Sequence, residues 1–478
     1  MQTRTLKKLS LSVAFLLSLG VAVWYGHPDA GISISRAAAA EAVADSDTPN
    51  GPYPGYMSWP AVKSKIADWT AAYPKLVTVS SLGKTYEGRD IPVVRICSKP
   101  DGAGTPEVMI LSGIHPREQQ PVIAVTRLVD KLLAGYSKDA SLTKLVDERA
   151  IYIVPIFNVD GKVYDLKNGN GTSRGADWRK NREPNADGTV GTDLNRNFGV
   201  RWGGARGYDP EWKASTIDTG SNIYEGDGPM SEPETRHLGA FIAAHKANLR
   251  AFMDLHSPLH VINLPAYAIG PDYDRYMALV AKMREGQAEP YPASDMRRDA
   301  QPPDAPRAGN SGVTYTWAYY TQGVYALNLE FAPPAKHKAG ILARYAPPDE
   351  IQSEYTSNIE GALLNFIDLG GTFPAAHSGS ASCKVEDALI SGDLIPGATV
   401  SWSPKSISGP CDYAVLVSGS RSIVVPSEYR LAPIKSGFTL QVDPKAVPGT
   451  SVPMTLYLWD RNRGETVAKF NLTIAPTK

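Results

Sequence analysis

Three apolar segments of the sequence are each followed by side chains that can bind a metal ion or accept a proton. The segments and the side chains that follow them are residues 108–112 with His115 and Glu118, residues 251–255 with His256, and residues 325–329 with Glu330. Two imidazoles and two carboxylates therefore lie where predicted strands stop. This set can build a hydrolytic zinc site, in which three N or O ligands hold the ion, one position stays open for water, and a base takes the water's proton.

A second histidine pair does not fit this chemistry. His256 and His260 have the spacing of the two histidines in a helical metalloprotease motif. However, no Glu follows His256, and Pro258 lies between the two histidines, where it would break a helix. His256 is therefore the candidate ligand, and we expect His260 to be structural.

The elements that must position these residues alternate between strands and helices from residue 56 to about residue 368, the pattern of an α/β layered domain. Strands are expected at residues 77–82, 91–97, 108–112 and 150–157, and helices over residues 58–72, from residue 121, and over residues 231–247. Ser231 and Glu234 have the spacing of a capping box at the start of the last of these helices.

The composition changes after Leu369, where short strand signals without helical periodicity replace the alternating pattern. These signals lie at residues 399–402, 413–417, 422–425, 438–442, 453–459 and 467–474. Short strands separated by Gly, Pro and Asp predict an all-β sandwich. Cys383 and Cys411 lie in this part and could pair, whereas Cys97 is expected to be a buried apolar filler.

The N-terminus is typical of an export signal. Three basic residues (Arg4, Lys7 and Lys8) precede an apolar stretch from Leu9 to Tyr25, and small residues that suit signal cleavage follow. The alternative is an uncleaved membrane anchor, for which the apolar stretch is short. We expect a signal and lead-in over residues 1–44, a catalytic domain over 45–372, a linker over 373–382 and a β-sandwich over 383–478. The protein is then secreted and extracellular.

The charge balance bears on possible partners. The 478 residues include 49 basic and 49 acidic side chains, and 42% are hydrophobic, which is an ordinary globular composition. A neutral chain gives no sign of binding nucleic acid or a membrane surface. We expect no nucleic acid partner, no membrane contact after signal removal, and a monomer.

Several polar segments between the strands could be ordinary surface turns when each is taken alone. Together with the strand ends they are the segments 113–118, 158–161, 178–182, 191–197, 231–235, 256–257 and 329–331. In order and rough spacing they resemble the zinc carboxypeptidase family, most closely the secreted bacterial carboxypeptidase T-like enzymes. The resemblance covers about residues 50–370. It implies an α/β fold with a mixed β-sheet flanked by helices, and peptide or protein C-termini as substrates.

The resemblance also implies roles around the metal. It makes His115, Glu118 and His256 the ligands of a Zn²⁺ ion, and Asp193 the carboxylate that orients His115. Too few residues precede the expected catalytic start for a prodomain like that of the pancreatic relatives, so we expect none.

Four more residues receive catalytic or binding roles from the same resemblance. Glu330 would be the general base and then the acid toward the leaving amine. Arg179 would stabilise the oxyanion. Asn195 and Arg196 would bind the terminal carboxylate of the substrate, for which the planar guanidinium of arginine is suited.

The sequence departs from the family pattern at one position. Relatives carry a tyrosine that helps to clamp the terminal carboxylate nine residues before the tryptophan matching Trp317, and this chain has Ala308 there. Arg307 or Tyr315 could replace it, or the clamp is looser. A cell-wall peptide hydrolase with the same zinc site therefore stays open, as does a binding or adhesion protein with an inert α/β part. Tyr315 matches a position that sets side-chain preference in the family, and its bulk argues against a deep pocket for basic residues.

Overall fold

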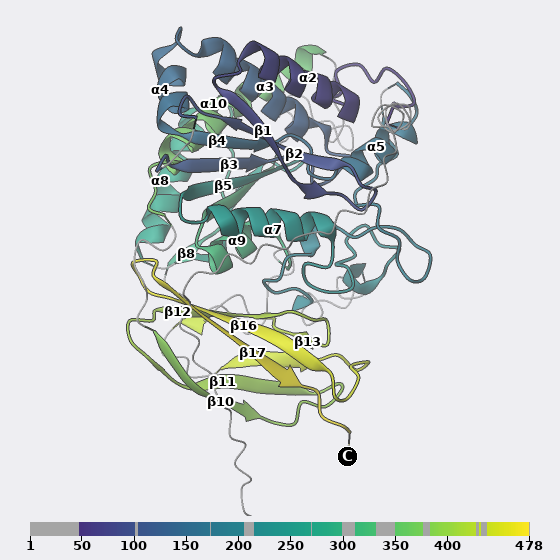
Figure 1. The fold of residues 1–478 in the computed structure, drawn as a ribbon, viewed down its shortest axis with the longest axis vertical. Coiled ribbons are helices and arrows are strands. Elements are labelled where there is room, and N and C mark those ends of the chain that lie inside the picture. Colours follow the sequence, from purple (N-terminus) through teal and green to yellow (C-terminus); the bar gives the residue numbers. More distant parts are fainter. Residues whose placement is uncertain are drawn as a thin grey trace, which may run out of the picture. The chain divides into compact units, whose positions relative to one another are not determined.

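A computed structural model gives the fold of the chain (Figure 1). It describes residues 47–100, 104–172, 174–204, 215–268, 270–298, 311–330, 349–375, 383–426, 430–431 and 437–477. The expected signal over residues 1–44, Arg307, Ala308 and most of the expected linker lie outside the described residues. Among the described residues, no helix combines the length and the apolar composition needed to cross a bilayer.

The first part of the described chain is built on a seven-stranded mixed sheet with the order β1-β2-β4-β3-β5-β9-β6. The strands are β1 (Val77–Lys84), β2 (Asp90–Ile96), β3 (Glu107–Leu111), β4 (Ala150–Val154), β5 (Leu249–His256), β6 (Val261–Asn263) and β9 (Tyr325–Glu330). Strands β4, β3, β5 and β9 run parallel, whereas β1, β2 and β6 pair antiparallel with their neighbours. The short strands β7 (Tyr267–Ala268) and β8 (Arg297–Arg298) form a separate pair.

Helices cover both faces of this sheet, with α2, α3 and α10 on one side and α7 and α9 on the other (Figure 1). The helices are α2 (Trp59–Ala72), α3 (Gln119–Gly135), α4 (Ala140–Glu148), α5 (Val159–Lys167), α7 (Pro233–His245), α8 (Pro271–Glu285), α9 (Thr314–Gln322) and α10 (Asp349–Gly370), with a 3-10 turn, η1 (Leu194–Arg196). Every residue of β3 and β4 is buried, as expected for parallel strands covered on both faces. This confirms the predicted α/β architecture.

The helix starts agree only in part with the sequence predictions. Ser58, at the start of the helix expected over residues 58–72, caps α2, because its hydroxyl accepts a hydrogen bond from the N–H of Ala61. The predicted capping box before α7 is wrong: Glu232 occupies the cap position without a capping hydrogen bond. The Ser231 hydroxyl instead donates to the Glu232 carboxylate, and Glu234 accepts from Asn181. Tertiary partners therefore take the side chains that a local motif would have used.

The candidate residues meet because parallel strands end at one edge of a sheet. His256 ends β5 and is paired in register with Glu330, which ends β9. His115 follows the neighbouring strand β3 through a turn at Gly113, whose φ of +68° is one that residues with a side chain rarely adopt. A Cβ atom at that glycine would also lie 3.3 Å from the Cα of Ile156. The turn brings His115 to the edge where His256 and Glu330 end.

The C-terminal part contains two antiparallel four-stranded sheets, ordered β10-β11-β15-β13 and β14-β12-β16-β17. Their strands are β10 (Lys384–Ser391), β11 (Thr399–Ser408), β12 (Tyr413–Ser418), β13 (Ile423–Val424), β14 (Arg430–Leu431), β15 (Phe438–Val442), β16 (Ser451–Trp459) and β17 (Glu465–Thr473). Buried side chains of both sheets, such as Trp402 and Leu456, form one core, which confirms the predicted β-sandwich. Cys383 and Cys411 are joined by a disulfide, and Cys97 is buried as expected.

The turn between β16 and β17 contributes a buried cation to the α/β part. Arg463 is 5% exposed and its Nη1 is paired with the Asp272 carboxylate at the start of α8. Asp272 also accepts hydrogen bonds from Tyr319 of α9 (3.0 Å) and Tyr325 of β9 (2.5 Å). The guanidinium carbon lies 4.2 Å from the centre of the Tyr325 ring. The sandwich is thus tied to α8, α9 and β9 through a charge pair away from water.

Replacing Arg463 by Met should destabilise the full-length protein by about 3 kcal/mol, the lower end of the cost of breaking a buried ion pair, because the Asp272 carboxylate would stay buried with the partly exposed Arg275 as its remaining cation among the described residues. Adding Asp272→Asn to that variant should restore part of the loss. Arg461→Met is the control, since Arg461 lies in the same turn but its ion pair with Asp412 is exposed and should contribute less than about 1 kcal/mol. Urea unfolding followed by fluorescence measures all three. Equal losses for Arg463→Met and Arg461→Met would contradict a buried pair.

Candidate metal centre

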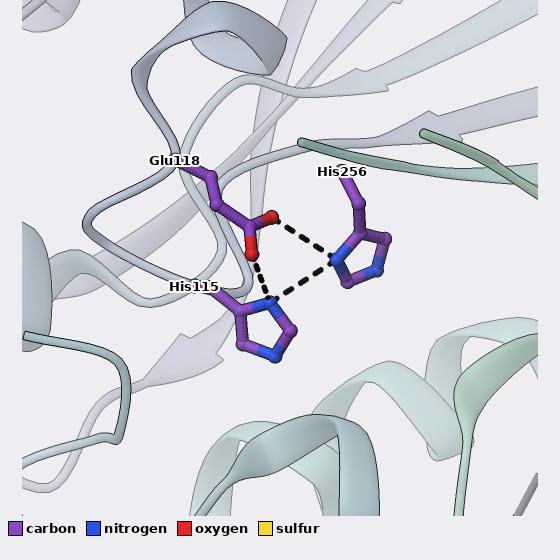
Figure 2. Close-up of side chains that lie close together, drawn as sticks. All are labelled: His115, Glu118 and His256. Carbon is purple, nitrogen blue, oxygen red and sulfur yellow. Dashed lines mark hydrogen bonds and ion pairs between the residues drawn. The ribbon is translucent and has the colours of Figure 1, made fainter. Parts of the chain in front are cut away.

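Three buried side chains converge on one point at the edge of the sheet (Figure 2). His115 Nδ1 lies 2.8 Å from Glu118 Oε1 and 3.1 Å from His256 Nδ1. His256 Nδ1 lies 3.2 Å from Glu118 Oε2. All three residues are at most 4% exposed. Within the described ranges, this is the sole group of three His, Cys, Asp or Glu side chains placed to hold a metal ion.

The donor set fits a zinc ion. Zinc binds His nitrogen and carboxylate oxygen at about 2.0–2.2 Å in a tetrahedral arrangement, so that two ligand atoms lie roughly 3.3 Å apart. The three separations here, 2.8, 3.1 and 3.2 Å, are close to that spacing. The two Nδ1 atoms face each other and the Glu118 carboxylate, and a cation between them can bind all three groups. Without a cation, the lone pairs of two neutral imidazoles at this distance would repel each other. The arrangement therefore suits a divalent ion with three protein ligands.

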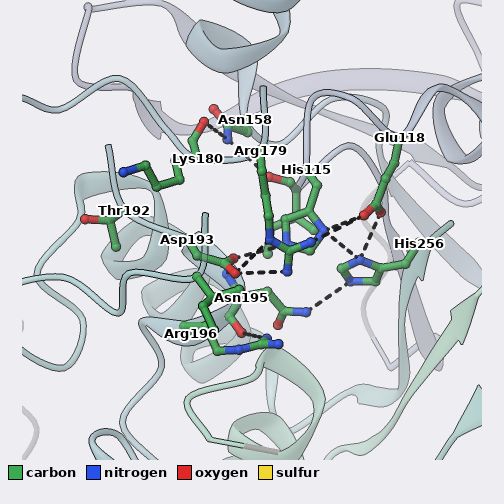
Figure 3. A network of polar contacts seen from close by, with 12 residues as sticks. His115, Glu118, Asn158, Arg179, Lys180, Thr192, Asp193, Asn195, Arg196 and His256 are labelled. Carbon is green, nitrogen blue, oxygen red and sulfur yellow. Dashed lines mark hydrogen bonds and ion pairs between the residues drawn. The ribbon is translucent and has the colours of Figure 1, made fainter. Parts of the chain in front are cut away.

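A buried carboxylate holds His115 from the side opposite the metal position (Figure 3). Asp193 Oδ1 lies 3.1 Å from His115 Nε2, and Asp193 is fully buried. Its other oxygen, Oδ2, accepts from Nε of Arg179 at 2.9 Å. Burial would raise the pKa of Asp193, but the Arg179 and His115 charges hold that pKa well below its ordinary value. Asp193 is therefore placed to accept a hydrogen bond from Nε2 of His115, which would leave Nδ1 available for a metal.

Glu330 lies next to this group at the end of β9. Its Oε2 accepts from the N–H of Leu259 at 3.3 Å. Burial raises the pKa of Glu330, and the His256 charge opposes that rise. A carboxylate with a raised pKa is a stronger base, which suits a group that must take up a proton and give it back.

The remaining candidates surround a cavity of about 410 Å³ above the metal position. The cavity is lined by His115, Arg117, Glu118, Arg179, Asn195, Arg196, His256, Ser257, Pro258, Leu259, Asn263, Val313, Tyr315, Asn328 and Glu330. Seven of the eight candidate residues thus share one cavity, and Asp193 lies behind it. His260 does not line this cavity and packs edge-on against Tyr291, with ring centres 3.9 Å apart.

Some residues of the site were not expected from the sequence. Asp254 lies in β5 two residues before His256, is fully buried, and has Oδ2 3.0 Å from His256 Nε2. Asn263 and Asn328 line the cavity and share a hydrogen bond of 2.8 Å. A carboxylate inside the otherwise apolar run 251–255 was the signal that could have identified Asp254, since buried charges require partners. Asn263 lies in a strand too short to show a pattern.

Residues 62–361 match the model of a protein family described as zinc carboxypeptidase. The chain is 37% identical over 162 residues to a zinc carboxypeptidase of Saccharothrix mutabilis subsp. capreolus, a match that covers 34% of this chain and 36% of that protein. It is 32% identical over 218 residues to mast cell carboxypeptidase A of Mus musculus, which covers 45% and 48% of the two chains. The chain spans about a third to a half of the length of these curated relatives.

Solved structures resemble the chain in fold. Bovine thrombin-activatable fibrinolysis inhibitor, in complex with tick carboxypeptidase inhibitor, aligns with a TM-score of 0.53 at 23% identity, over 66% of this chain and 97% of that chain. Carboxypeptidase A from Helicoverpa armigera also aligns with a TM-score of 0.53 at 23% identity, over 70% and 78% of the two chains. At this identity the likeness concerns the fold, and it agrees with a mixed sheet flanked by helices.

Proposed function

The chain belongs to the zinc carboxypeptidase family, and we propose that it hydrolyses the C-terminal peptide bond of peptides or proteins with the aid of one Zn²⁺ ion. The observation that carries this proposal is that the His115, Glu118 and His256 donor atoms converge in the same cavity as Glu330 and Arg196. Ligands, a base and a carboxylate-binding cation are the parts that terminal peptide hydrolysis requires.

His115, Glu118 and His256 would hold the zinc ion, and Asp193 would orient His115. When bound, the ion would supply a water of lowered pKa, about 7, and polarise the scissile carbonyl. The distances of 2.8 to 3.2 Å between the donor atoms support this assignment.

Glu330 would move the proton. Its carboxylate, whose Oε2 also accepts from the Leu259 N–H, would take the proton from the attacking water. The same carboxyl group then donates this proton to the leaving amine. Arg179 would stabilise the oxyanion that forms on the carbonyl, because its guanidinium lines the cavity and is held in place by Asp193.

Arg196 and Asn195 would bind the terminal carboxylate of the substrate. Both side chains line the cavity, and Asp193 fixes the turn that carries them by accepting from the N–H of Asn195 at 3.0 Å. Tyr315 lines the same cavity and is our candidate for the clamp that the family places at the position of Ala308. An internal peptide bond would offer no carboxylate to the partly buried Arg196, so the enzyme would act on chain ends.

The Arg196→Leu variant tests this preference for chain ends. Losing a buried charge partner costs about 2–5 kcal/mol, so kcat/KM for a peptide with a free C-terminus should fall roughly 30- to 4000-fold. The same peptide with a C-terminal amide is the matched control, because it offers no carboxylate. The wild type should prefer the free acid strongly, and Arg196→Leu should hydrolyse both peptides slowly and almost equally. An undiminished acid-to-amide ratio in the variant would contradict the role of Arg196.

The departure at Ala308 favours a second candidate, a cell-wall peptide hydrolase with the same zinc site. A looser clamp would admit the D-amino-acid linkages of wall peptides. The purified protein can be incubated with L-peptides and with muropeptides, and the released amino acids measured. Release from L-peptides supports the carboxypeptidase, whereas release from muropeptides supports the cell-wall hydrolase.

We also propose that the protein is secreted and acts as a monomer. The basic and apolar N-terminus supports export, and the Cys383–Cys411 disulfide suits an oxidising compartment. Mass spectrometry of protein from the culture medium would identify the cleavage position, and light scattering would give its mass in solution.

A further inference from the structure

Asp254 occupies a position beside His256 that resembles the position of Asp193 beside His115. Side chains two residues apart in a strand lie on the same face, which brings Asp254 to the Nε2 side of His256. Oδ2 of Asp254 lies 3.0 Å from His256 Nε2, and Oδ1 of Asp193 lies 3.1 Å from His115 Nε2. Each imidazole of the metal group therefore has a fully buried carboxylate opposite its metal-facing nitrogen.

Thr314, the first residue of α9, fixes two neighbours of His256. Its hydroxyl donates to Oδ2 of Asp254 at 2.5 Å, and its N–H donates to Oδ1 of Asn195 at 3.0 Å. Because Oδ1 of Asn195 is thus occupied, the Asn195 group that faces His256 Nε2, at 3.2 Å, is the NH₂ group (Figure 3). An amide NH₂ can only donate a hydrogen bond.

Asp254 and Asn195 therefore favour different tautomers of the His256 ring, with the hydrogen on Nε2 for Asp254 and on Nδ1 for Asn195. A lone pair on Nε2 would accept from Asn195, but it would put the ring hydrogen on Nδ1, which faces Glu118 and His115. A hydrogen on Nε2 serves Asp254 and leaves the Nδ1 lone pair for a metal. In that form Asn195 does not bond to His256, and its NH₂ group can turn to a substrate carboxylate.

The buried carboxylate of Asp254 also destabilises the fold, which is not expected of a residue with a purely structural role. Its second oxygen, Oδ1, has no hydrogen-bond partner among the described residues, although the residue is fully buried. Buried polar atoms without partners destabilise a protein, and their presence requires an explanation. A role toward His256 supplies one.

We propose that Asp254, held by Thr314, is a positioning residue that keeps the hydrogen of His256 on Nε2, so that Nδ1 binds the metal and Asn195 is released for the substrate. This inference rests on the proposed zinc site. It makes the start of α9 part of the metal centre, although none of its residues binds the ion.

The test compares zinc affinities of full-length variants by competition with a chromophoric chelator. Asp254→Asn should bind zinc about 10- to 100-fold more weakly than the wild type, the usual cost of losing an outer hydrogen-bond partner of a ligand. Thr314→Val should show a smaller loss, and Thr314→Ser, which keeps the hydroxyl, should restore the wild-type affinity. Thr316→Val is the control, because Thr316 is buried in the same helix and its hydroxyl bonds to the Val313 carbonyl instead.

A second readout is the ¹⁵N spectrum of the labelled histidines in the metal-free protein. His256 should carry its hydrogen on Nε2 in the wild type and shift toward Nδ1 in Asp254→Asn, a change that a merely structural role would not produce. Wild-type zinc affinity together with an unchanged His256 spectrum in Asp254→Asn would overturn the inference and leave the proposed function intact. Failure of the wild type itself to bind zinc would overturn both.

Discussion

The Glu330→Gln variant is expected to bind zinc normally and to lose nearly all of its turnover. Glutamine has the shape of glutamate but cannot accept the water's proton, so the base and later acid are removed together. General acid–base catalysis contributes roughly 10²–10⁴-fold, and kcat should fall by that factor. The rate is measured with a blocked dipeptide that has a free C-terminus, and the zinc content by elemental analysis.

Glu285→Gln is a matched control for this substitution, because Glu285 lies at the exposed end of α8 and pairs only with Lys282 among the described residues. It should leave both kcat and zinc content unchanged. A Glu330→Gln variant whose kcat stays within a few-fold of the wild type would show that another group takes the proton.

The His115→Ala variant is expected to lose both zinc and activity. Two ligands would remain, and Asp193 would lose the imidazole that it contacts at 3.1 Å. The loss of zinc affinity should be larger than the roughly 10- to 100-fold loss caused by removing a hydrogen-bond partner of a metal ligand. Zinc per mole of protein after dialysis against a weak chelator measures the loss, and circular dichroism establishes that the variant is folded.

His260→Ala is the control for the loss of a histidine. His260 lies four residues after His256 but packs against Tyr291 outside the metal group. It should keep its zinc and most of its activity. Equal zinc loss in both variants would mean that the ion is held elsewhere or that the site depends on general stability.

The convergence of the site could be predicted from the sequence because local patterns determine where parallel strands end. Each strand that ends at the site is a short apolar run that can be recognised from neighbouring residues alone, namely Val108–Ser112, Ala251–Leu255 and Tyr325–Leu329. The ends of parallel strands lie at one edge of a sheet, so the side chains that follow these runs meet there. The same reasoning predicted most strands of the sandwich, where turn residues separate short runs.

Other features could not be predicted because they depend on contacts between distant segments. Arg463 looks like an ordinary turn residue until the fold brings Asp272 to it, 191 positions away in the sequence. Ser231 and Glu234 have the spacing of a capping box, but the fold gives the Ser231 hydroxyl to Glu232 and the Glu234 carboxylate to Asn181. Strand β10 (Lys384–Ser391) was missed because its sequence does not alternate clearly.

The proposed hydrolysis depends most on a single zinc ion bound at the edge of the sheet. Diffraction from crystals of the zinc-loaded protein, recorded on both sides of the zinc absorption edge, would locate that ion directly. We expect one anomalous peak about 2.0–2.2 Å from His115 Nδ1, His256 Nδ1 and the Glu118 carboxylate, with a fourth position open toward Glu330. Zinc bound at another place, or imidazoles of His115 and His256 too far apart to reach one ion, would contradict the account.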